Sequence, residues 1–180
     1  MPGKFLSEDT KRKILNRRRR KRLVISAATR WTIGLVAAVI ILLNLFTHVI
    51  QIVRYSGNSM EPNLHNGQVL VLLKTQEVTE GDIIAFYYNN QVLVRRVVST
   101  GGKQISIADD GVVSINARPV VEDYLSERSI GQCNITFPYF IKTGDVFVMG
   151  DNRSIAMDSR LQEIGTVPLE RIIGKVVLAI

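Results

Sequence analysis

A serine in a tight loop is the first candidate for chemistry in this sequence. Ser59 follows Gly57 and Asn58, which tolerate the tight backbone that presents a hydroxyl group to a cleft, and Pro62 stiffens the chain just beyond it. A serine hydroxyl becomes a useful nucleophile when a neighbouring base accepts its proton. The sequence must therefore supply a base for Ser59.

Neither histidine is well placed to be this base. His48 lies within a long apolar run and His65 lies in a loop. A serine on a β-rich domain without a suitable histidine suggests a serine–lysine dyad, in which burial lowers the pKa of the lysine so that its neutral amine accepts the serine proton. The expected lysine would lie in an apolar strand that packs beside the Ser59 loop.

Alternating apolar and β-branched residues predict the elements that position this site. The predicted strands are residues 68–73, 82–88, 91–98, 104–108, 112–116, 145–149 and 172–178. Asn89-Asn90 and Asp110-Gly111 indicate hairpin turns, and residues 117–144 indicate a loop-rich insertion. The predicted fold class is therefore mainly β, an antiparallel β-barrel or sandwich of short strands.

The N-terminal part of the chain has a different character. Residues 1–30 form a basic tail with 11 Lys/Arg against 2 acidic residues, and residues 31–53 contain no charged residue. About 20 apolar residues span a hydrocarbon core of about 30 Å, so residues 31–53 predict a transmembrane helix that makes the lipid bilayer a partner. The positive-inside rule then predicts a cytoplasmic tail and an extracytoplasmic domain over residues 54–180. A cleaved signal peptide fits this long apolar run less well.

The formal net charge of +7 does not belong to the predicted domain. After Arg30 there are 12 Lys/Arg against 14 acidic residues, a net charge of −2, so the sequence disfavours a nucleic-acid partner. The single cysteine, Cys133, excludes an intramolecular disulfide. The sequence contains no Cys/His cluster of the kind that binds zinc, and we expect neither a metal nor an organic cofactor.

From about residue 31 to its C-terminus, the chain resembles the type I signal peptidases, the bacterial leader peptidase family with a serine–lysine dyad. It is most similar to the short Gram-positive form with one N-terminal anchor. Three motifs carry the resemblance: Ser59-Met60 with Pro62 and Leu64, Gly81-Asp82 before an apolar strand, and Gly150-Asp151-Asn152-Arg153 with Asp158-Ser159-Arg160. The third motif is the most specific of them.

The resemblance implies a membrane-anchored serine endopeptidase that removes signal peptides from exported pre-proteins. Ser59 would be the nucleophile, and its backbone N–H would help to form the oxyanion hole. An extended substrate would pair with an exposed sheet edge as an added strand. Met60, Leu64 and Val94 would flank the site, as walls of shallow substrate pockets or as ordinary core residues. The charged residues of the third motif, Asp151, Arg153, Asp158 and Arg160, are predicted to form a network that holds the turn near Ser59.

Two positions depart from the family pattern. Arg95-Arg96-Val97 matches a strand that usually reads lysine-arginine-valine, so Arg95 occupies the position of the general base. Arginine is effectively never deprotonated in proteins and cannot do the same work. In addition, Ala156 stands where the family usually has a serine that hydrogen-bonds the lysine.

The sequence leaves three explanations open for these departures. The enzyme uses a substitute base, for which His65, Lys74 and Lys103 are candidates. Alternatively, the chain is a catalytically weak or inactive homologue that acts as a binding or assembly factor for secreted proteins. The third explanation is an altered copy of an active enzyme.

Overall fold

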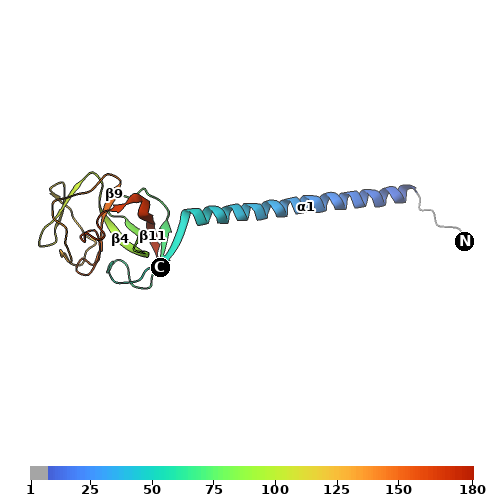
Figure 1. Cartoon of the computed structure of the whole chain (residues 1–180). Helices are drawn as coiled ribbons and strands as arrows, with labels where there is room; N and C mark the ends of the chain where they lie inside the picture. Colours follow the sequence, from blue (N-terminus) through green and yellow to red (C-terminus); the bar gives the residue numbers. More distant parts are fainter. Residues whose placement is uncertain (1–7) are drawn as a thin grey trace. The chain divides into compact units, whose positions relative to one another are not determined.

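The computed structural model describes residues 8–180, which divide into a first unit ending at Thr47 and a second unit, His48–Ile180. Helix α1 (Glu8–Val49), which grades from blue to blue-green in Figure 1, forms the described part of the first unit, and its last two residues belong to the second. Within the described residues, Thr29–Val49 is the segment that is long and apolar enough to cross a membrane. Its apolar side chains are exposed, including Trp31 at 82%, as expected for a helix whose surface suits lipid rather than a protein core.

The predicted apolar helix over residues 31–53 extends too far at its C-terminal end. The helix ends at Val49, and Ile50–Arg54 form strand β1. Strand β1 pairs antiparallel with β2 (Val69–Leu73) over its whole length. Three of its five residues are β-branched, which favours a strand over a helix. Hydrogen bonds to β2 replace those that the same backbone groups would form within a longer helix.

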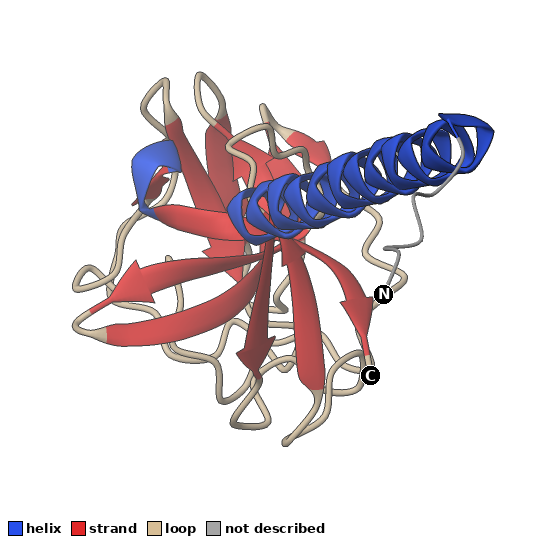
Figure 2. Ribbon diagram, turned by 90° about the vertical axis from the view of Figure 1, so that its right-hand side faces the viewer, coloured by secondary structure: helices blue, strands red, loops and turns tan. Residues whose placement is uncertain are grey.

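The second unit contains eleven strands in two antiparallel sheets, drawn in red in Figure 2. The larger sheet has the order β1-β2-β11-β3-β4-β9-β10, with β3 Ile83–Tyr88, β4 Gln91–Thr100, β9 Asp145–Met149, β10 Val167–Pro168 and β11 Ile172–Ala179. The smaller sheet has the order β7-β6-β5-β8, with β5 Gln104–Ile107, β6 Val113–Ile115, β7 Arg118–Pro119 and β8 Tyr139–Phe140. A short 3-10 helix, η1 (Leu169–Arg171), precedes β11. The prediction of a mainly β, antiparallel fold is confirmed.

The β3–β4 hairpin shows how closely the local sequence determines this fold. Asn89 and Asn90 have φ values of 44° and 62°, and Tyr88 pairs with Gln91 across the turn. Two consecutive left-handed residues form the turn type whose twist matches that of the flanking strands, and asparagine tolerates this conformation well. The hairpin matters for the site because β4 carries Arg95.

One hydrophobic cluster lies beneath the loop that joins β1 to β2. It combines three loop residues with residues of the larger sheet: Tyr55, Met60, Leu64, Leu70, Leu72, Ala85, Val94 and Ile173, all at most 9% exposed. Full burial of a methionine or leucine side chain contributes about 1.5–3 kcal/mol. The loop that contains Ser59 is therefore fixed to the sheet by its own side chains.

The segment of residues 117–144 is largely irregular, as predicted, with only the two-residue strands β7 and β8. Its apolar residues nevertheless pack on a second cluster, which includes Val98, Ile105, Phe147 and Met149. The segment contributes the fully buried Ile141 to this cluster, and five of its partly buried residues pack against it: Val120, Ile130, Ile135, Phe137 and Tyr139. The insertion is therefore part of the folded unit and covers the core around the smaller sheet.

Asp82 at the start of β3 connects the beginning of that strand to β11. Its carboxylate pairs with Lys175 at 2.7 Å and accepts the Thr79 backbone N–H at 2.8 Å. Burial alone would raise the pKa of Asp82, but the hydrogen bonds from Lys175 and Thr79 outweigh it and the pKa is lowered. The carboxylate therefore stabilises the fold above its unfolded-state pKa of about 4, and this stabilisation is lost as the pH falls through the lower folded-state value.

We expect Asp82→Asn to lower the free energy of unfolding by about 0.5–1 kcal/mol at pH 7, because the pair is partly exposed. The difference from the unaltered chain should shrink as the pH falls below about 4. Denaturant titrations at several pH values measure both quantities. Asp109→Asn, at an exposed aspartate, is the matched control and should show no such pH-dependent difference.

Candidate active site

Ser59 lies in the loop between β1 and β2 and is half-buried. The loop turns tightly here: Gly57 has a φ of 113°, and the Leu64 N–H donates to the Met60 carbonyl at 2.9 Å. Tyr55 supports the turn from below, because its hydroxyl accepts the Met60 N–H at 3.0 Å and lies 3.2 Å from Ser59 Oγ. The Ser59 hydroxyl is therefore held between a rigid backbone turn and a buried phenol.

Arg95 of β4 is the second residue at the Ser59 hydroxyl. Its Nη1 donates to Ser59 Oγ at 2.8 Å and to the Val94 carbonyl at 2.6 Å, and its Nε donates to the Met157 carbonyl at 2.9 Å. Strand β4 thus brings the residue at the expected base position directly to the candidate nucleophile. The direction of the hydrogen bond is opposite to what a base needs, because the guanidinium donates to the hydroxyl.

Arg95 is largely withdrawn from solvent, with only 5% of the residue exposed. Burial lowers the pKa of Arg95, and the negative charge of Asp158 together with Tyr55 offsets part of this effect. Because the ordinary pKa of arginine lies far above neutral pH, Arg95 remains protonated there. Arg95 therefore brings a permanent positive charge to Ser59.

The segment from Gly150 to Arg160 holds the Ser59 turn from the other side. The Asn152 N–H donates to the Ser59 carbonyl at 3.0 Å. Asp158 fixes this segment, because its carboxylate accepts the Gly150 N–H at 2.9 Å and binds Arg160 Nη2 at 2.7 Å. Asp158 and Arg160 are both 0% exposed, so this ion pair is part of the core beneath the site.

Asp151 connects the same segment to β4 and to the serine loop. It forms a two-pronged pair with Arg96, at 2.8 Å and 2.6 Å, and accepts the side-chain amide of Asn63 at 2.8 Å. Burial by itself would lower the pKa of Arg96, but the hydrogen bond and charge of Asp151 outweigh it and raise that pKa. Asp151 thus ties together three chain segments that meet around Ser59.

Arg153 anchors the insertion to the same network through Glu122. The two side chains form a buried ion pair, and the Tyr124 hydroxyl donates to Glu122 at 2.6 Å. The Tyr124 ring also lies under the Arg96 guanidinium, 4.2 Å from its centre. Burial and the neighbouring Glu122 raise the pKa of Tyr124 well above its ordinary value, so it stays a hydrogen-bond donor.

The structure brings the four charged residues of the third motif, Asp151, Arg153, Asp158 and Arg160, together with the Ser59 loop. Sequence reasoning missed four partners of this arrangement: Tyr55, Asn63, Glu122 and Tyr124. Asn63 and Tyr124 are joined by a hydrogen bond across 61 residues, and no periodic pattern in the sequence marks such a contact. Only Tyr55 could have been suspected from the sequence as a partner of Ser59, because it is an aromatic residue four positions before the serine.

Met60, Leu64 and Val94 lie in the core rather than at an accessible wall. Their exposed fractions are 0%, 3% and 3%, and all three pack in the cluster beneath the serine loop. Of the two roles considered for them, the structure places these side chains in core packing.

None of the three candidate substitute bases contacts the Ser59 hydroxyl, whose hydrogen-bond partners among residues 8–180 are Tyr55 and Arg95. Lys103 pairs with Glu80 at 2.7 Å. His65 is exposed, and its backbone N–H donates to Gln68. Lys74 is exposed just after β2. The hypothesis of a substitute base therefore finds no residue within reach of Ser59 in this conformation.

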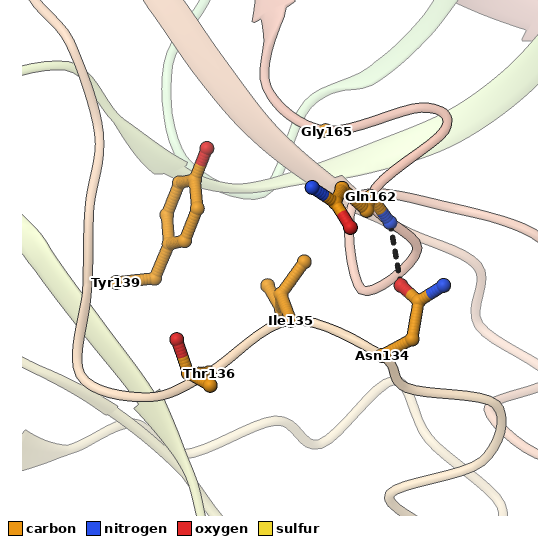
Figure 3. A pocket seen from close by; sticks show the side chains of 6 residues that line it. All are labelled: Asn134, Ile135, Thr136, Tyr139, Gln162 and Gly165. Carbon is orange, nitrogen blue, oxygen red and sulfur yellow. Dashed lines mark hydrogen bonds between the residues drawn. The ribbon is translucent and has the colours of Figure 1, made fainter.

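A hollow of about 390 Å³ elsewhere on the β unit is lined by a different set of residues. Figure 3 shows them: Asn134, Ile135, Thr136, Tyr139, Gln162 and Gly165. The Gln162 backbone N–H donates to the Asn134 side chain at 2.6 Å, which closes one side of the hollow. Since the hollow includes no predicted site residue, the candidate chemistry remains at Ser59.

Known proteins offer clear matches to this chain. The family model described as "Signal peptidase, peptidase S26" matches residues 28–180. Signal peptidase I of Bacillus licheniformis is 31% identical over 157 residues, covering 80% of this chain and 83% of that protein. Signal peptidase I T of Bacillus subtilis strain 168 is also 31% identical over 157 residues, covering 80% of each protein. A crystal structure of a signal peptidase I from Enterococcus faecalis V583 is 28% identical, covers 55% of this chain and 96% of that chain, and has a TM-score of 0.48.

Proposed function

This chain belongs to the peptidase S26 family of signal peptidases, and from that premise we propose that it is a membrane-anchored endopeptidase in which Ser59 attacks the substrate. The family consists of serine endopeptidases that act on signal peptides of exported proteins. The observation that supports Ser59 most directly is its half-buried hydroxyl, held by Tyr55 and Arg95 at a rigid turn.

In the proposed reaction, Ser59 Oγ attacks the scissile carbonyl, the amine of the mature protein leaves, and water hydrolyses the acyl-enzyme. The negatively charged oxygen that forms during the attack would accept a hydrogen bond from the Ser59 N–H. This N–H donates to no acceptor among the described residues. Arg95, 2.8 Å from Oγ, stabilises the developing alkoxide but cannot take its proton. The serine proton therefore passes to solvent water, the departing amine takes a proton from water, and we expect cleavage to be slow.

The substrate is proposed to lie as an added strand at the edge of the larger sheet. Strand β1 ends that sheet, and its chain continues directly into the Ser59 loop. Backbone pairing with such an edge is a common way to bind an extended peptide. Thr29–Val49 would anchor the chain in the membrane with the basic N-terminal segment in the cytoplasm, so that the β unit meets exported chains on the outer side.

The proposed function is tested by cleavage of a pre-protein by the full chain in detergent. We expect slow release of the signal peptide that disappears in Ser59→Ala. Ser56→Ala is the matched control, because Ser56 is an exposed serine in the same loop, and it should retain the rate of the unaltered chain. Cleavage that persists unchanged in Ser59→Ala would contradict the assignment of the nucleophile.

A further inference from the structure

The charge on Arg95 is unusual among the buried charges of this protein. Six charged residues of the β unit are buried: Arg95, Glu122, Asp151, Arg153, Asp158 and Arg160. Five of them belong to an ion pair, with one another or with Arg96. Within the described part of the chain, Arg95 has only neutral oxygens as partners. Asp158 acts on this cation only from beyond ion-pair distance, and no carboxylate contacts it. A buried cation that no carboxylate contacts is costly, and an anion at this place would offset that cost.

The guanidinium of Arg95 also has donors left over. Nε and Nη1 donate to two carbonyls and to Ser59 Oγ, whereas Nη2 has no acceptor among residues 8–180. No buried side-chain nitrogen or oxygen in this part of the chain lacks a hydrogen-bond partner. Nη2 must therefore reach the surface, although Arg95 as a whole is 95% buried. It does so beside the half-buried Ser59 hydroxyl.

This arrangement suits a carboxylate. A charged guanidinium nitrogen binds a carboxylate oxygen more favourably than a neutral acceptor, so Nη2 can bind one oxygen while the Ser59 hydroxyl donates to the other. Only 5% of Arg95 is exposed. An anionic group at the end of an extended chain can reach so small an opening, whereas an anionic group in the middle of a bulky surface is kept away from it. We propose that Arg95 and Ser59 bind the C-terminal carboxylate of a peptide.

The ligand follows from the reaction proposed for Ser59, so its identity rests on the proposed function. Hydrolysis of the acyl-enzyme converts the ester carbonyl on Ser59 Oγ into a free carboxylate at the new C-terminus of the signal peptide. That group forms within reach of Arg95, which lies 2.8 Å from Oγ. Arg95 therefore makes the active site bind the cleaved signal peptide, and release of that peptide is slow.

Binding of the tripeptide Ala-Gly-Ala to the full chain in detergent tests this inference. The free acid should bind at least about tenfold more tightly than the C-terminal amide. Ser59→Ala, which cannot cleave, should show a smaller preference for the free acid, because it keeps Arg95 and loses the hydroxyl donor. Sodium acetate should displace the free acid only at much higher concentration, because it lacks the peptide backbone. Equal binding of acid and amide to the unaltered chain would overturn the inference.

Arg95→Met separates the role of the guanidinium from other effects. It should abolish the preference for the free acid, whereas Arg171→Met, at an exposed arginine of η1, should leave it unchanged. A preference that persists in a folded Arg95→Met chain, or acetate binding as tight as that of the free acid, would overturn the proposal. A chain that prefers the acid but cleaves no pre-protein contradicts only the proposed function. A chain that cleaves at Ser59 without this preference contradicts only the inference.

Discussion

Replacing Arg95 with lysine and Ala156 with serine together is expected to raise kcat/KM for pre-protein cleavage by about 10²- to 10⁴-fold, the contribution of a positioned general base. Arg95 donates to Ser59 Oγ and cannot accept its proton. A lysine on the same strand would occupy surroundings in which the present residue is only 5% exposed. Such burial lowers the pKa of an amine and provides the neutral form that accepts the serine proton.

The second substitution supplies orientation for the new amine. Ala156 is fully buried, and its side chain offers no oxygen to hold a lysine at Ser59. We therefore expect Arg95→Lys alone to give a smaller gain than the double variant. Steady-state cleavage in detergent measures the gain, and the rate should rise with pH through the lowered pKa of the lysine, because the neutral amine is the active form.

A matched control distinguishes the base from a general effect of lysine. Arg96→Lys keeps the positive charge at the neighbouring residue, which pairs with Asp151 instead of touching Ser59, and should give no gain. If the double variant is folded and no faster than the unaltered chain, a missing base is not what limits this enzyme. The slow step would then have to lie in substrate binding or in product release.

Much of the fold could be predicted because its strands are marked locally. Residues 145–149 are a short run of β-branched and aromatic residues that Gly150 ends, and the prediction and strand β9 coincide. The Asn89-Asn90 turn was recognisable because few residues other than glycine tolerate two positive φ values. Strand β1 was missed because its apolar residues continue the composition of the preceding helix, and only pairing with β2 distinguishes strand from helix there.

The site could be predicted only in part, for a related physical reason. Ser59 and Arg95 have identifiable motifs, and the resemblance alone indicated that the two meet. The partners that hold them come from segments without periodic patterns, such as Glu122 in the insertion, which pairs with Arg153 across 31 residues. Contacts of this kind depend on the complete tertiary structure, and a local sequence pattern carries no signal for them.

Asp158→Ala is expected to lower the free energy of unfolding of the β unit by about 3–5 kcal/mol, the usual cost of breaking a buried ion pair from one side. Asp158 and Arg160 are both 0% exposed, so the variant would leave the Arg160 guanidinium buried without its counter-ion. It would also leave the Gly150 N–H without its acceptor. Denaturant titration of the full chain in detergent, followed by circular dichroism, measures the loss.

Two further variants identify the source of this loss. Lys103→Ala breaks an ion pair in which both side chains are more than a third exposed, and it should cost about 0–1 kcal/mol. Asp158→Asn removes the charge but keeps an oxygen that can accept the Gly150 N–H, so it should fall between the two. An Asp158→Ala loss no larger than that of Lys103→Ala would contradict a structural role for the pair. The Asn152 N–H of the segment 150–160 donates to the Ser59 carbonyl. If that segment did not depend on Asp158, the Ser59 turn would be held mainly by the apolar cluster below it.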